Sequence, residues 1–274
     1  MSGRKKKISK ELRISCAVLI GLCCLLILLL EYLLVKNIIH KEVFYQIESR
    51  EENIENSKKE DSDNHETIGW VRVQGTNIDY TLYGVLKNDF SYPVVSQTYM
   101  WSLNFDSKFH STMIVYGHNI MNLGPNPKLK SDQFERMEEL MGFVYYDFAK
   151  ENKYIQLSID GENYLYKIFA VNFMTVDELD SYPKGEFDST AKNKYFSEIT
   201  KNSIYDYDVD VSVDDDILSV VTCSRFFKDG KNYDFIVTGR RVKDGEKIEN
   251  YKVSRNKNYE KINEILKGDE DNEK

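Results

Sequence analysis

Hydrophobic and polar residues divide the chain into an apolar N-terminal run, a polar connector and a longer region of short, strand-like patterns. Residues 14–30, ISCAVLIGLCCLLILLL, carry no charge, and after Glu31 the apolar run continues to Val35. About 20 residues at ~1.5 Å rise per residue span ~30 Å, which is the thickness of a bilayer core. The pattern therefore predicts a transmembrane helix over residues 14–35.

The polar connector and the following region differ clearly in composition. Residues 36–66 are rich in Glu, Lys, Asn and Ser, which predicts a polar helix leaving the membrane and then a flexible spacer. Residues 67–250 alternate β-branched and aromatic runs with turn signals, which is typical of one folded domain. Residues 251–274 are highly charged and predict a C-terminal tail that forms a frayed helix.

Short strands dominate the patterns of the predicted domain, with helices inserted between them. Helical spacing occurs around Met137–Met141 and over residues 189–205, where Tyr195 and Ile199 share one side. Many short strands with few helices between them predict a mainly β barrel or sandwich with inserted helices and an N-terminal helical segment. The predicted strands lie in IGWVRVQGTNIDYTLY (turn at Gly75 and Asn77), TMIVYG (112–117), KYIQLSI and NYLYKIFAVNFM (hairpin turn at Asp160–Gly161), ILSVVTC (217–223) and YDFIVTGRRV (233–242).

Charge is distributed unevenly, and this sets the expected orientation. The formal net charge is −8, yet residues 1–13 hold six basic residues against Glu11. Basic residues before an apolar run keep the N-terminus in the cytoplasm, so the remainder is expected to be extracellular. A cleaved signal peptide is the rival interpretation, but no small-residue cleavage site follows Glu31, which favours an uncleaved single-pass anchor. The acidic body argues against binding of nucleic acid.

The cysteines point to one candidate nucleophile. Cys16, Cys23 and Cys24 lie in the predicted anchor, where a small polarizable side chain contributes to packing and needs no reactive role. Cys223 is the only cysteine outside the first 24 residues, so it has no partner for an intramolecular disulfide. A single thiol kept in an exported domain is a candidate reactive residue.

Histidine is the usual helper of a nucleophilic thiol, because the free thiol has a pKa of about 8.5. The chain has four histidines, of which His40 and His65 fall in the juxtamembrane and spacer region and His110 in a polar segment. His118 directly follows the predicted buried strand TMIVYG, a position that loop catalytic residues often occupy. A hydrogen-bonded structural histidine is the competing interpretation, and spacing does not separate the two.

Three segments together resemble sortases of class B, the membrane-anchored cysteine transpeptidases of Gram-positive bacteria. They are IGWVRVQGTNIDYTLY, MIVYGHN, and VVTC at a strand end, about a hundred residues after the histidine. The resemblance covers roughly residues 67–245, and the anchor and spacer agree with it. It implies a sortase-like β-barrel with inserted helices and an N-terminal helical segment.

The resemblance also implies a reaction and its partners. Cys223 would attack a carbonyl in the C-terminal sorting signal of a secreted protein and form a thioester, with His118 as proton donor to the leaving amine. A peptidoglycan precursor or another amine would then accept the acyl group, joining the protein to the cell wall. No cofactor and no metal are expected, and Asp214, Asp215 and Asp216 are interpreted as a solvated turn rather than a weak calcium site.

The sequence departs from the family at the arginine that assists the oxyanion. Counting back five residues from Gly239 reaches Asp234, which is not basic. Arg225, two residues beyond the nucleophile, is the candidate for this role, with a solvated loop arginine as the competing interpretation. Lys231 is a second candidate, as a point charge without the planar fork of arginine. A shifted strand register that points Arg240 or Arg241 at the site is the third interpretation, which is disfavoured because Arg240 lies about 20 Å along the strand from Asp234.

Two alternative functions stay open at this point. One is a cysteine peptidase that hydrolyses the thioester, because water and an amine compete for the same intermediate. The other is a non-catalytic sortase-like surface protein, which the missing arginine favours and the pair of His118 and Cys223 disfavours.

Overall fold

The computed structural model describes most of the region that follows the spacer, together with the N-terminal helix. The chain divides into two units, Met1–Tyr45 and Gln46–Lys274. The first contains helix α1 (Lys10–Val43), whose apolar stretch Val18–Val35 is long enough to cross a membrane and exposes its side chains. By length and composition it is a candidate membrane span. The described residues are 10–43, 66–76, 78–84, 100–102, 109–117, 119, 137–182, 187–248 and 250–272.

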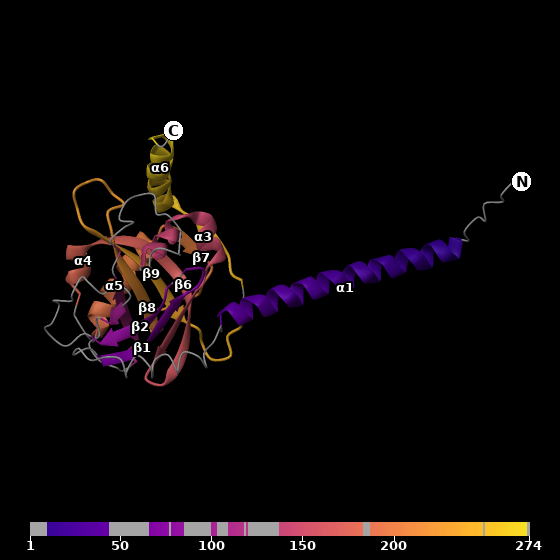
Figure 1. The fold of residues 1–274 in the computed structure, drawn as a ribbon, viewed down its shortest axis with the longest axis horizontal. Coiled ribbons are helices and arrows are strands. Elements are labelled where there is room, and N and C mark those ends of the chain that lie inside the picture. The colour runs from indigo at the N-terminus through magenta and orange to yellow at the C-terminus, as the bar shows by residue number, and fades with distance from the viewer. Residues whose placement is uncertain are drawn as a thin grey trace, which may run out of the picture. The chain divides into compact units, whose positions relative to one another are not determined.

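A closed β-barrel forms the centre of the second unit (Figure 1). Its strands follow the order β1-β2-β3-β4-β8-β9-β6-β5, and β5 pairs with β1 to close the barrel. The pairs β2–β3 and β4–β8 are parallel, and the other neighbours are antiparallel. The mainly β fold predicted from the sequence is confirmed. The bounds are β1 Glu66–Val73, β2 Asp79–Gly84, β3 Met100–Ser102, β4 Thr112–Gly117, β5 Tyr154–Ile159, β6 Glu162–Thr175, β8 Ile217–Ser224 and β9 Tyr233–Arg241.

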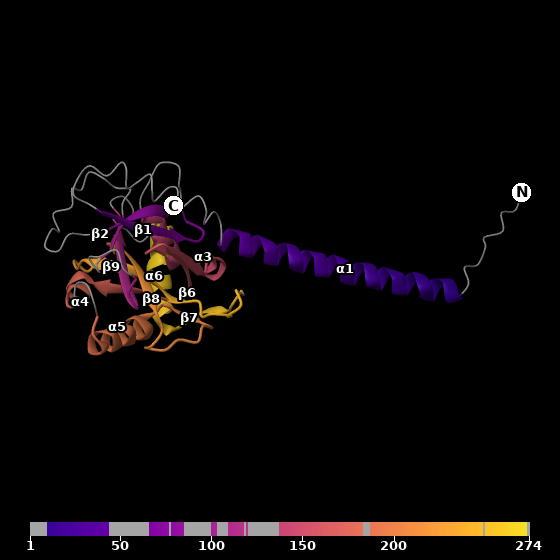
Figure 2. The same cartoon turned by 90° about the horizontal axis from the view of Figure 1, so that it is seen from below.

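Helices and a small second sheet surround the barrel. Figures 1 and 2 place α4 and α5 together on one side and α3 with β7 on another. Strand β7 pairs with β10 outside the barrel. The bounds are η1 Met137–Val144 (a 3-10 helix), α3 Tyr146–Glu151, α4 Val176–Asp180, α5 Ser189–Asn202, β7 Tyr205–Tyr207, β10 Val253–Arg255 and α6 Lys257–Asn272.

Side chains alternate between the inner and the outer face along the barrel strands, and this produces two separate hydrophobic clusters. Leu218 and Val220 of β8 belong to the larger one, together with residues of most barrel strands. Val221 of the same strand points the other way and joins the second cluster with Tyr195 and Ile199 of α5. The outer face of β8 and β9 is therefore covered by α5, as the predicted apolar side of residues 189–205 requires.

The predicted hairpin turn at Asp160–Gly161 is present between β5 and β6. Both residues have positive φ, 55° and 77° respectively. A two-residue turn of this kind matches the right-handed twist of the flanking strands, and glycine adopts it without strain. This turn fixes the register in which Ile159 pairs with Glu162.

Two elements differ from the expectations drawn from sequence. The helical spacing around Met137–Met141 forms a 3-10 helix rather than an α-helix, and it buries Leu140 and Met141. The C-terminal segment is not a frayed tail, because β10 pairs with β7 and α6 buries one side against the barrel cluster. The buried residues of that side recur at helical spacing within a charged sequence, and they are Tyr259, Ile262 and Leu266.

Glu246 neutralises two largely buried cations beside β6 and β9. Its carboxylate accepts hydrogen bonds from Arg240 (2.5 and 2.9 Å) and Lys167 (2.6 Å), and the Arg240 side chain is 3% exposed. Burial of a charge without a partner costs several kcal/mol, so this carboxylate stabilises the end of the barrel. These hydrogen bonds, above all those from Arg240, hold the pKa of Glu246 below its ordinary value of 4.5.

Replacement Glu246→Gln is therefore expected to lower the free energy of unfolding by about 3 kcal/mol at neutral pH. Because the pKa of the folded state is depressed, this contribution is complete above pH 4.5 and is lost as the pH falls further. Urea unfolding at neutral and at acidic pH measures the difference, which should shrink in acid. Asp244→Asn, an exposed carboxylate two residues away, is the control, and equal losses in both variants would contradict the assignment.

Candidate active site

Cys223 lies at the end of β8 on the outer face of the barrel. It has the same strand parity as Val221, whose side chain packs in the cluster under α5, and it is half-buried. The following Ser224 is buried and ends the strand. The thiol is thus held by regular backbone and is still accessible from one side, as a nucleophile requires.

Two polar side chains from neighbouring strands lie on this face, and one of them contacts the thiol. In the antiparallel pair β8–β9, Cys223 lies opposite Asp234. Tyr116 of β4 places its hydroxyl oxygen 2.7 Å from Cys223 Sγ and 2.8 Å from Asp234 Oδ1. The tyrosine hydroxyl therefore bridges the sulfur and the carboxylate, and three strands contribute one group each.

Electrostatics of this cluster keep both hydroxyl and thiol protonated. Burial, followed by the charges of Asp234 and Cys223, raises the pKa of Tyr116 far above its ordinary value. Burial and the Asp234 charge also raise the pKa of the Cys223 thiol, while the hydrogen bond with Tyr116 and the charge of Arg225 lower it. The net direction for Cys223 is upward, so at neutral pH the resting site holds a thiol and needs a proton acceptor to react.

The residues on both sides of His118 are bonded to the end of β8, whereas His118 itself lies outside the described residues. Thr222 Oγ1 donates to the carbonyl oxygen of Gly117 at 2.7 Å. Asn119 Nδ2 donates to the carbonyl oxygen of Cys223 at 3.1 Å. Thr222, Gly117 and Asn119 are all buried, so these bonds tie the end of β4 to the strand that carries the thiol.

The Thr222 hydroxyl therefore binds the end of β4 to β8, a role that the preference of threonine for strands does not explain. Replacement Thr222→Val keeps the shape and leaves the buried carbonyl oxygen of Gly117 without this donor, which is expected to cost about 1–3 kcal/mol. Urea unfolding measures the loss. A stability equal to that of the unmodified protein would show that the hydroxyl does not bind the end of β4.

Arg225 points away from the barrel at the start of the β8–β9 connection. It is exposed, while its neighbours Ser224 and Phe226 are buried, and Phe226 stacks on Phe173 of β6 with ring centroids 5.1 Å apart. Its charge is nevertheless among those that lower the pKa of Cys223. Lys231 is exposed in the same connection, next to Gly230, which has a positive φ of 81°.

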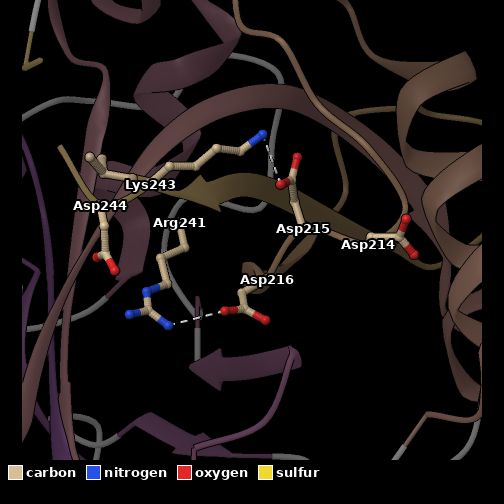
Figure 3. A pocket seen from close by; sticks show the side chains of 7 residues that line it. Asp214, Asp215, Asp216, Arg241, Lys243 and Asp244 are labelled. Carbon is tan, nitrogen blue, oxygen red and sulfur yellow. Dashed lines mark hydrogen bonds and ion pairs between the residues drawn. The ribbon is translucent and has the colours of Figure 1, made fainter. Parts of the chain in front are cut away.

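Arg240 and Arg241 lie at the opposite end of the barrel from the thiol. Arg240 pairs with Ile217, the first residue of β8. A polar pocket lined by residues 214–216 and 241–244 opens there (Figure 3). Asp216 binds Arg241 at 3.2 Å and Asp215 binds Lys243 at 3.1 Å, so these two carboxylates are neutralised by cations. The pocket is separated from Cys223 by the length of β8, roughly 20 Å.

Sequence reasoning found Cys223 but assigned no role to Tyr116 and treated Asp234 only as the absence of a basic residue. Both gave a usable signal, since Tyr116 stands two positions before His118 and Asp234 occupies the position of the expected arginine. What was lacking was the strand register, which sets the two side chains on the same face as the thiol.

Comparisons with known proteins confirm the resemblance to class B sortases. Sortase B of Staphylococcus aureus is 24% identical over 169 residues, which cover 58% of this chain and 64% of that protein. This chain thus matches less than two thirds of the length of that relative. No family model matches the chain.

Solved structures of sortase B share the fold of the barrel unit. The structure of Clostridium perfringens sortase B aligns with a TM-score of 0.52 and 22% identity, covering 70% of this chain and 100% of that one. The S. aureus sortase B structure aligns with a TM-score of 0.53 and 16% identity, covering 78% and 97%. The S. aureus protein has also been solved as a substrate complex, and a sortase B has been solved in complex with a ligand given as Gly3. The chain has the sortase B fold.

Proposed function

We propose that this protein is a membrane-tethered cysteine transpeptidase that cleaves the sorting signal of secreted proteins and transfers the acyl group to a cell-wall amine. The observation that carries the proposal is the attachment of both neighbours of His118 to the end of β8, at Thr222 and Cys223. A nucleophile and a proton donor are required within reach of one carbonyl, and this attachment favours such a pair. The complex of S. aureus sortase B with a substrate and the complex of a sortase B with Gly3 support the two kinds of ligand.

The proposed reaction has two acyl transfers at one sulfur. Cys223 Sγ attacks the carbonyl carbon of the signal peptide as the thiol proton passes to a base of the site, and the carbonyl electron pair moves to oxygen. The tetrahedral intermediate collapses to a thioester when protonated His118 gives a proton to the leaving amine. An incoming amine then attacks the thioester and loses its proton to His118, and the released sulfur takes back the first proton. Arg225 is the proposed stabiliser of the negative oxygen, supported by its electrostatic reach to Cys223.

The proposed location, with the barrel unit outside the membrane, follows from the charges that precede the apolar stretch of α1. The basic residues before the apolar stretch Val18–Val35 favour a cytoplasmic N-terminus and an extracellular barrel unit. This location is where secreted proteins and peptidoglycan precursors meet, so the anchor and the reaction support each other.

Mass spectrometry of residues 46–274 with a panel of sorting-signal peptides tests the proposal. The expected result is a covalent adduct on Cys223 whose mass fits a thioester, and its conversion to a new amide when an amine acceptor is added. His118→Ala should reduce adduct formation by about 10²–10⁴-fold, the usual effect of removing a general acid. His110→Ala, a half-buried histidine before β4, is the matched control.

Other results would replace the proposal with one of its alternatives. Release of the free acid in the presence of a saturating amine would indicate a peptidase that hydrolyses the thioester. A folded protein that forms no adduct with any peptide would indicate a non-catalytic surface protein, which the carboxylate of Asp234 beside the thiol favours.

A further inference from the structure

The carboxylate of Asp234 stands where class B sortases are expected to have a cation, directly opposite the nucleophile. Asp234 is 2% exposed and lies across the β8–β9 pair from Cys223. A carboxylate cannot stabilise a negative oxygen, so it does not substitute for arginine in that role. A buried carboxylate can instead accept a proton, provided that a hydrogen-bonding group connects it to the thiol that must be deprotonated.

Tyr116 is that connecting donor, and hydrogen-bond chemistry fixes the direction of the bonds. An ionised carboxylate only accepts, so the single proton of the Tyr116 hydroxyl is donated to Asp234 Oδ1 across 2.8 Å. The hydroxyl oxygen then keeps its lone pairs for the thiol, whose S–H donates to it across 2.7 Å. The result is a continuous path from the Cys223 thiol through Tyr116 to Asp234.

We propose that Tyr116 and Asp234 form a proton relay that deprotonates the Cys223 thiol during its attack on an acyl group. As the S–C bond forms, the thiol proton passes to Tyr116 Oη and the phenolic proton passes to Asp234 Oδ1. The sulfur electron pair makes the new bond, the carboxylate becomes a carboxylic acid, and the phenol is unchanged. Tyr116 is a catalytic residue because it touches the reacting sulfur, and Asp234 acts through it as a positioning and proton-accepting residue.

The surroundings of the three groups agree with a relay rather than with a resting thiolate. Burial raises the pKa of both Tyr116 and Cys223, so neither ionises permanently at neutral pH. The charged and titratable neighbours in the described part of the chain include Tyr195 of α5, whose pKa the Asp234 charge raises, and the exposed Arg225. Arg225 is the weaker influence on the thiol, since it is the last of the causes that act on Cys223.

Two substitutions separate a relay from a purely electrostatic effect. Asp234→Asn removes a charge that raises the pKa of Cys223, so the thiol should ionise at lower pH. Tyr116→Phe removes a hydroxyl that can donate to the sulfur once its proton has left, an interaction that lowers the pKa of Cys223, so the thiol should ionise at higher pH. An electrostatic role therefore gives opposite effects on the reaction rate, whereas a relay gives the same loss in both variants because each breaks the proton path.

The experiment measures thiol ionisation and acylation separately in residues 46–274. Ultraviolet absorbance of the thiolate gives the ionisation curve, and the burst of p-nitrophenolate from p-nitrophenyl acetate gives the acylation rate across the pH range and in heavy water. Both variants should acylate roughly 10²-fold more slowly below the pH at which the thiol ionises, the usual effect of losing a general base. The double variant should be no slower than either single one, and only the unmodified protein should be slowed by heavy water.

Controls and contradicting outcomes follow from the same curves. Thr238→Val, which removes a buried hydroxyl from β9, should leave both curves unchanged. Faster or unchanged acylation by Asp234→Asn would overturn the relay, as would a heavy-water effect that persists in Tyr116→Phe. If Asp234→Asn does not fold, Tyr116→Phe and the isotope effect of the unmodified protein still decide the question.

The proposal rests on the proposed function for its biological substrate, but the reagent needs no sorting signal. A relay detected with p-nitrophenyl acetate in a protein that turns over no sorting peptide would refute the proposed function and leave the relay standing. Turnover of sorting peptides that is insensitive to both substitutions would support the proposed function and refute the relay.

Discussion

Replacement of Cys223 by alanine is expected to abolish acyl transfer, by a factor of at least about 10⁴, with the barrel intact. No other group in the described site can form the thioester, because Tyr116 and Asp234 only move protons in the proposed scheme. The sulfur is half-buried at the end of β8 and is not a member of either hydrophobic cluster, so its removal should cost little stability. Product formation from a sorting peptide and an amine measures the loss, and urea unfolding checks the fold.

The chain supplies its own matched control for this substitution. Cys23 and Cys24 are exposed thiols of α1, and the double variant Cys23→Ala/Cys24→Ala of the full chain should transfer acyl groups at the normal rate. If Cys223→Ala retained more than about 1% of the activity, the covalent mechanism would be wrong, because removal of a nucleophile leaves only contributions from binding.

The strands that carry the site were predictable because each is a short apolar run with clear ends. TMIVYG matches β4 residue for residue, and the predicted strands at 217–223 and 233–242 differ from β8 and β9 by one residue at their ends. Local residue pattern suffices for such elements, since burial on both faces selects β-branched and apolar side chains continuously. Cys223 was found for the same reason, as the odd residue at the end of such a run.

The contacts of Cys223 were not predictable, because they depend on register between strands far apart in sequence. Tyr116 and Cys223 are 107 positions apart, and they meet only because β4 and β8 pair in parallel with Gly117 beside Thr222. A shift of one residue would turn every side chain of one strand to the other face. Helix α6 was predicted as a frayed helix, and only its packing against the barrel was missed, since its apolar side is defined by what it covers.

Closure of the barrel depends on an approach of two backbones that only glycine allows, at Gly69 of β1. A Cβ at this position would lie 2.1 Å from the carbonyl oxygen of Ser158 in β5, well inside van der Waals contact. The obstructing atom belongs to the backbone, so it cannot rotate away as a flexible side chain does. Relief would require β1 and β5 to separate, and this pair is the one that closes the barrel.

Gly69→Ala is therefore expected to lower the free energy of unfolding by more than about 3 kcal/mol, a large share of the stability of an ordinary domain. Urea unfolding measures the loss. Gly161→Ala is the control, because its Cβ meets nothing within 4 Å and only the positive φ of 77° opposes it. That variant should lose about 1 kcal/mol. Similar losses in both variants would mean that β1 and β5 do not approach as closely as the barrel requires. Because β1 and β5 do not border the strands of Cys223, Tyr116 and Asp234, the folded fraction of Gly69→Ala should still acylate at the normal rate.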